Sequence, residues 1–125
     1  MAEERGSAVV AIALMMCLVV LFYCEVVEAA TYTVGGANGW TFDVADWPKG
    51  KNFKAGDILV FNYSPGTHDV VVVDESGYNS CISPSGAKVY QTGKDHIKLV
   101  KGQNYFICDF EGHCDFGMKI AITAT

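Results

Sequence analysis

The sequence predicts an all-β protein, a two-layer β-sandwich in which helix is limited to short turns. Three observations lead to this expectation. Glycines recur along residues 30–125 and divide the chain into short segments, as expected of strands joined by tight turns. These segments are rich in Val, Ile, Tyr and Phe, which favour strands. No segment carries a long series of apolar residues at helical spacing.

The expected elements follow from this pattern in chain order. Six apolar segments are predicted strands: Thr31–Val34, Ile58–Tyr63, His68–Val73, His96–Leu99, Asn104–Cys108 and Met118–Thr123. Two further segments have room for a turn or two of helix: Asp43–Trp47 and Asp74–Asn79. We expect Trp40 and Trp47 in the apolar core, because burial is the commonest role of tryptophan. His96 alternates with Lys98 and is expected on the polar face of its strand.

The N-terminal segment is expected to be a secretory signal peptide, residues 1–29, which is removed from the mature protein. The segment Ala8–Cys24 is almost unbroken in its apolar character. Val27 and Ala29 occupy the −3 and −1 positions of a cut before Ala30. The apolar run is only just long enough to cross a bilayer, and a retained signal anchor is the alternative. The remaining chain is then one secreted, extracellular domain without a membrane attachment.

Length and charge exclude several classes of protein. A chain of 125 residues, 50% of them hydrophobic, has material for one modest core and not for a multidomain enzyme. Residues 30–125 carry eight lysines and no arginine against ten acidic residues, a net charge of −2. The chain therefore lacks the basic surface that binding to a nucleic-acid backbone requires.

The densest group of metal-binding side chains lies close to the C-terminus. Cys108, His113 and Met118 follow one another at C-x4-H-x4-M spacing, in a glycine-containing loop between two predicted strands. His68, at the start of another predicted strand, offers a fourth donor. A thiolate, two imidazoles and a weak thioether form the ligand set of a blue copper electron-transfer site. A zinc site is the alternative, formed by the same cysteine and histidines with Cys114 as its fourth ligand.

Three cysteines remain after the predicted cleavage: Cys81, Cys108 and Cys114. In an oxidising compartment two of them should pair, and one thiol is left over. Neighbouring residues of an extended segment point to opposite sides. If His113 faces the metal, Cys114 faces away from it and can reach Cys81. The alternative bridges include Cys108 and would remove the thiolate ligand.

These motifs resemble those of the phytocyanins over essentially all of residues 30–125. Four parts of the sequence carry the resemblance: Ala30–Gly36, Phe61–His68, Cys108 and Gly117–Ile120. The resemblance implies a cupredoxin-like Greek-key β-sandwich that holds one type 1 copper ion in a secreted plant protein of the cell wall or apoplast. The ligand positions that it implies are His68, Cys108, His113 and Met118. It also implies a disulfide between Cys81 and Cys114.

The expected function is one-electron transfer, with copper as the cofactor and small redox partners or redox proteins as donors and acceptors. We expect a monomer. A small copper oxidase, the enzymatic alternative, needs an open coordination position, which Met118 and the bulky Phe110 and Phe116 oppose. The other alternative is an extracellular or cell-wall signalling or structural protein in which copper redox chemistry is secondary.

The charge of the loop from Cys108 to Met118, the ligand loop, predicts a preference among redox partners. Asp109, Glu111 and Asp115 lie close to His113 in the sequence, and all lysines of residues 30–125 lie outside this loop. Phytocyanins of this kind commonly carry proline where this chain has Glu111. If these carboxylates surround an exposed imidazole, they should attract cationic redox partners and repel anionic ones.

Overall fold

The computed structural model describes residues 11–16 and 28–125. Residues 11–16 are helical, and most of the predicted signal peptide, including its apolar run beyond residue 16, lies outside the described residues. Within the described ranges, no helix combines the length and the apolar character that crossing a membrane requires. The cleavage site before Ala30 therefore stays a prediction.

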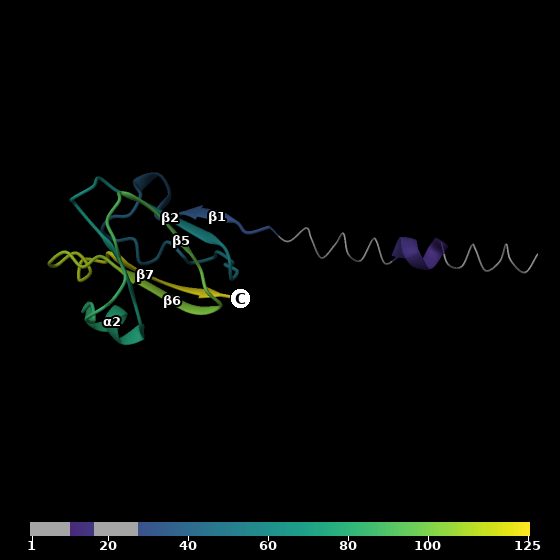
Figure 1. The fold of residues 1–125 in the computed structure, drawn as a ribbon. Coiled ribbons are helices and arrows are strands. Elements are labelled where there is room, and N and C mark those ends of the chain that lie inside the picture. Colours follow the sequence, from purple (N-terminus) through teal and green to yellow (C-terminus); the bar gives the residue numbers. More distant parts are fainter. Residues whose placement is uncertain (1–10, 17–27) are drawn as a thin grey trace, which may run out of the picture.

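Residues 28–125 fold into short strands with little helix, in agreement with the predicted all-β class (Figure 1). The elements are β1 (Thr31–Thr33), η1 (Gly36–Asn38), β2 (Ile58–Asn62), β3 (Val70–Val73), α2 (Glu75–Ser80), β4 (Val89–Tyr90), β5 (Lys94–Lys98), β6 (Gly102–Ile107) and β7 (Lys119–Ala124).

The strands form two sheets that pack face to face. One sheet has the order β1-β2-β5, in which β1 and β2 are parallel and β5 is antiparallel to β2. The other has the order β4-β3-β6-β7, and all of its pairs are antiparallel. The loop between β6 and β7 lies at the opposite end of the domain from the C-terminus (Figure 1). Strands β3 and β6, which are far apart in sequence, are neighbours, so residues near their ends can share one site.

The core fills the space between the sheets. Its largest side chains are aromatic, with Phe61 placed between Trp40 and Phe106 at ring-centroid distances of 5.0 and 5.4 Å. In strand β5 the alternation of the sequence determines which side chains face the core. Asp95 and Ile97 are buried, and the residues that alternate with them are exposed. His96 lies on that exposed side, as predicted.

A second apolar cluster lies on the outer face of the larger sheet, beneath α2. It contains Val71, Val73, Ile107 and Cys114, with Tyr78, Cys81, Ala87 and Tyr105 packed against it. The side chain of Asp74 caps α2 by accepting a 2.8 Å hydrogen bond from the Gly77 N–H. A Cβ at Gly77 would lie 2.8 Å from Cβ of Val73, so the glycine permits the close approach of the helix to β3.

A buried carboxylate just before β2 anchors the segment that leads into β1. Asp57 is 3% exposed, and its two oxygens accept 2.9 Å hydrogen bonds from the backbone N–H groups of Ala30 and Lys54. The Ala30 carbonyl in turn accepts a bond from the N–H of Ile58. The start of the domain is therefore fixed to β2 by side-chain and backbone bonds together.

Several element boundaries differ from those expected. The expected strand at His68 begins at Val70, because the chain at His68 is still leaving a turn. The segment Asp43–Trp47 consists of turns without helix, whereas Asp74–Asn79 comprises the N-cap and most of helix α2. Strand β4 was not expected, since it has only two residues and is defined by its pairing with β3.

Candidate metal centre

His68 is positioned by the loop that joins β2 to β3. A turn precedes it, closed by a 3.1 Å hydrogen bond from the Thr67 N–H to the Ser64 carbonyl. The next residue, Asp69, is buried, and its carbonyl accepts a 2.8 Å hydrogen bond from Nε1 of Trp40. The backbone that carries the imidazole is therefore fixed on both sides, by the turn before it and by Trp40 after it.

The side chain of Asp69 links the two halves of the site. Its carboxylate accepts a 2.7 Å hydrogen bond from the backbone N–H of Asp109, which directly follows Cys108. Asp69 is 5% exposed, so this charge-assisted bond is shielded from water. The segment with His68, just before β3, is thereby held against the segment with Cys108, just after β6.

The other three predicted ligands lie on the loop between β6 and β7. The Cys108 N–H donates to the Met118 carbonyl (3.0 Å), and the Met118 N–H donates to the His113 carbonyl (3.1 Å). Gly117 has a φ of 84°, and a Cβ there would lie 3.1 Å from the backbone of Asp43, so this turn requires glycine. Cys108 and Met118 thus face each other across the base of a closed loop, and His113 lies within it.

Three of the predicted ligands converge. The donor atoms of His68, Cys108 and His113 all lie within 4.8 Å of one another. The Nδ1 atoms of the two imidazoles are 3.1 Å apart, and Sγ of Cys108 is 3.6 Å from Nδ1 of His113. One sulfur and two imidazole nitrogens directed at a common point form a donor set that suits copper or zinc better than a hard cation such as magnesium. Met118 is fully buried and hydrogen-bonded to this group through its backbone.

Burial shifts the pKa of two of the donors, Cys108 and His68. It raises the pKa of the Cys108 thiol to about 11. It also lowers the pKa of His68, with a further contribution from the neighbouring His113. At neutral pH without metal, Cys108 is therefore a thiol and His68 is a neutral imidazole. His68 can bind a metal without first losing a proton, whereas Cys108 must release one.

Aromatic rings surround the two imidazoles. The ring of Phe42 lies 4.8 Å from that of His113 and 5.8 Å from that of His68. Phe110 approaches His113 at 5.6 Å, and Tyr63 approaches His68 at 6.2 Å. Cys108 is buried, whereas both histidines keep part of their surface exposed. The sulfur is thus shielded from water while the imidazoles are reached from outside.

The other two cysteines of the described chain form a disulfide. Cys81, at the end of α2, is bonded to Cys114, and Cys108 is a buried free thiol. The preferred pairing is therefore present, and the bridges that include Cys108 are absent. The extended backbone that was expected to turn Cys114 away from His113 is wrong, however, because residues 111–117 are a series of turns.

Residues outside the predicted ligand set also shape the site. Asp69 and Phe42 were not singled out from the sequence, and Trp40 was assigned only to the core. Asp69 had a detectable signal, since it is a charged residue at the start of a run of valines. Tyr63, whose ring lies beside His68, is itself held in place because its hydroxyl donates a hydrogen bond to the buried carboxylate of Asp95. Burial and then this hydrogen bond raise the pKa of Tyr63, which keeps the phenol protonated.

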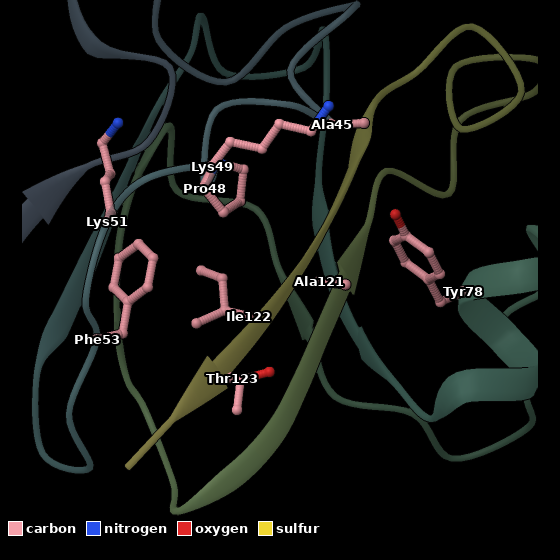
Figure 2. A pocket seen from close by; sticks show the side chains of 9 residues that line it. All are labelled: Ala45, Pro48, Lys49, Lys51, Phe53, Tyr78, Ala121, Ile122 and Thr123. Atoms are coloured by element: carbon pink, nitrogen blue, oxygen red, sulfur yellow. The ribbon is translucent and has the colours of Figure 1, made fainter.

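A cavity of about 310 Å³ lies on another part of the surface, beside β7 (Figure 2). Its lining combines Phe53 and Ile122 with the side chains of Lys49, Lys51 and Tyr78. It contains no carboxylate, histidine or thiol and shares no residue with the converging donors. The cavity is therefore separate from the predicted metal centre.

Comparison with known proteins places the chain in a family. A plastocyanin-like domain matches residues 38–118, a range that includes all four predicted ligands. The chain is 55% identical over 128 residues to a basic blue protein of Arabidopsis thaliana, with 99% of each chain covered. Cucumber basic protein, a blue copper protein, matches in structure with a TM-score of 0.76 and 61% identity, over 77% of this chain and all of that one. Spinach plantacyanin matches with a TM-score of 0.69 and 53% identity, at the same coverage.

The family agrees with the chemistry of the donors. A sulfur and two imidazoles fit type 1 copper, and the described residues hold this group in a cupredoxin-like sandwich. These observations and comparisons together show that the chain belongs to the phytocyanins, blue copper proteins that transfer electrons and are not enzymes.

Proposed function

We propose that His68, Cys108 and His113 would hold the copper ion and that Met118 would be its weak fourth ligand. The observation that carries the proposal is the convergence of one sulfur and two imidazole nitrogens within 4.8 Å. The place of Met118, buried and bonded through its backbone to Cys108 and His113, supports its role as the weak fourth ligand. Zinc is the competing metal, but Cys114 is held in a disulfide and is not free to be its fourth ligand.

Copper in this site would supply a one-electron couple. The protein would hold the ligands in nearly one geometry for both oxidation states, because the Asp69–Asp109 bond fixes the two strand ends and backbone bonds close the loop between β6 and β7. Burial of Cys108 keeps water from the sulfur. The part-exposed imidazoles, in contact with Phe42, are the route by which an electron reaches the surface.

Titration with Cu(II) tests the ligand set. We expect an intense blue colour from thiolate-to-copper charge transfer at one equivalent of copper. Replacing Cys108 with Ser, or His68 with Gln, should abolish the colour. His96→Gln is the matched control, because His96 is exposed on β5 and not among the converging donors, and it should titrate like the unmodified protein. A blue Cys108→Ser variant, or a colourless unmodified protein, would contradict the proposal.

We further propose that residues 1–29 are a signal peptide and that the protein is secreted as a monomer. The apolar run Ala8–Cys24 and the small residues before Ala30 support this proposal. Mass spectrometry of the protein recovered from the medium of expressing plant cells should give Ala30 as its first residue. A cell-associated chain that still contains Ala8 would favour the retained anchor instead.

A further inference from the structure

A groove with aromatic walls adjoins the metal donors. It has a volume of about 600 Å³ and is lined by Phe42, Asp43, Asp115, Phe116 and Gly117. Phe42 is 42% exposed and Phe116 is 70% exposed, although both are large apolar side chains. The ring of Phe42 contacts both imidazoles, so this groove is continuous with the electron-transfer site. Exposed aromatic groups that line one groove are typical of a surface that a partner covers.

The charge around the groove has one sign. Asp43 and Asp115 are part of its lining, and two further exposed carboxylates, Asp109 and Glu111, belong to the same ligand loop. None of these four forms a salt bridge in the described part of the chain, in which Lys49 pairs with Asp46.

The lysine nearest to the loop in sequence is directed elsewhere. Nζ of Lys119 donates a 3.0 Å hydrogen bond to the backbone carbonyl of Tyr78. It also lies 4.3 Å from the centre of the Tyr78 ring, beside α2. No lysine is among the residues that line the groove. The carboxylates at its edge are therefore not neutralised by a basic side chain of the groove itself.

We propose that this groove is the docking surface for a redox protein that presents lysine or arginine side chains around its own cofactor. This inference rests on the proposed electron-transfer function and adds the class of partner. The partner's cations would pair with Asp43 and Asp115 and lie over the exposed face of Phe116. In each encounter one electron passes from the reduced copper centre to the partner's oxidised cofactor, and no bond or proton is exchanged.

Stopped-flow oxidation of the reduced, copper-loaded protein tests the proposal. The cationic oxidant is ferricytochrome c with a ring of lysines at its haem edge, and the anionic one is hexacyanoferrate(III). The groove variant is Asp43→Asn with Asp115→Asn. Asparagine is well suited to position 43, where φ is 56°, because it tolerates the left-handed region. The control, Asp46→Asn with Glu75→Gln, removes the same charge from exposed residues outside the groove.

We expect the cytochrome reaction of the unmodified protein to slow as salt is added and the hexacyanoferrate reaction to accelerate. The groove variant should react with the cytochrome about tenfold more slowly at low salt, on the order of what two charges at contact distance contribute. Its dependence on salt should weaken with both oxidants. The control should stay within about twofold of the unmodified protein, because its charges lie further from the contact.

The outcomes separate this proposal from the one on which it depends. Blue colour and reduction potential are measured first, and a protein without a blue centre would refute the proposed function. A blue groove variant that behaves like the control would refute the docking surface alone. Phe116→Ser completes the test, since it should slow the cytochrome reaction at every salt concentration without changing the slope. An unchanged rate in this variant would refute the aromatic contribution to docking.

Discussion

Removal of the Cys81–Cys114 disulfide should destabilise the domain strongly while leaving the copper ligands in place. The bridge joins residues separated by 33 positions in the sequence. In the chain-entropy treatment, a closed loop of this length lowers the free energy of folding by about 4 kcal/mol. A domain of this size has a free energy of unfolding of roughly 5–15 kcal/mol, so the bridge supplies a large fraction of it.

Urea unfolding of the Cys81→Ala, Cys114→Ala double variant measures the effect. With a urea m-value of about 1.5 kcal/mol per molar, the midpoint should fall by about 2.5 M. The blue colour should survive in the folded variant, because backbone bonds to Phe110 and Met118 hold His113 in its loop. Reduction of the unmodified protein without copper should reproduce the shift. A midpoint that falls by less than about 0.5 M would refute the reasoning, since the unfolded chain would then not be restricted by the bridge.

Three further predictions concern the site. Met118→Gln should lower the reduction potential and keep the blue colour, because a harder fourth donor favours the oxidised metal; voltammetry that shows an unchanged potential would contradict the role of Met118 as the weak fourth ligand. Copper binding at pH 7 should release about one proton, because the pKa of Cys108 is about 11 and His68 is already neutral. Calorimetry in buffers of different ionisation enthalpy measures this release, and no release would contradict it. Asp69→Ala should cost about 2 kcal/mol in urea unfolding by leaving the Asp109 N–H unpaired, whereas Asp69→Asn, which keeps an acceptor, should cost less.

The proposed ligand set follows from the sequence because its chemistry is local. Cys108, His113 and Met118 lie within one loop, and their spacing alone brings a sulfur and an imidazole to the same place. His68 can join this group only if β3 lies beside β6. The sandwich class alone does not determine that neighbour, and the pairing of Val71 with Ile107 establishes it.

The supporting residues were less accessible because their roles arise from tertiary contacts. Phe42 is in a turn, and nothing in its neighbourhood indicates that its ring lies against the imidazoles of two distant loops. Likewise, the two-residue strand β4 has no local periodicity and exists through its bonds to β3. The disulfide was identified through an assumed extended segment, although turns in fact direct Cys114 away from His113.

The hydrogen bond between Ala30 and Asp57 has a consequence for the order of export and folding. In the uncut chain the donor at this position is a neutral peptide N–H, 2.9 Å from a buried carboxylate. A cut after Ala29 would turn the same nitrogen into an ammonium group without moving it, and a hydrogen bond that already ends on a carboxylate would become an ion pair with the same oxygen. Because the acceptor is charged in both chains and Ala30 is exposed, the added contribution is that of an exposed ion pair, about 0.2–1 kcal/mol. A cut at this position would thus create a positive charge beside a negative one that the domain already holds, and the cut chain would be slightly more stable than the uncut one.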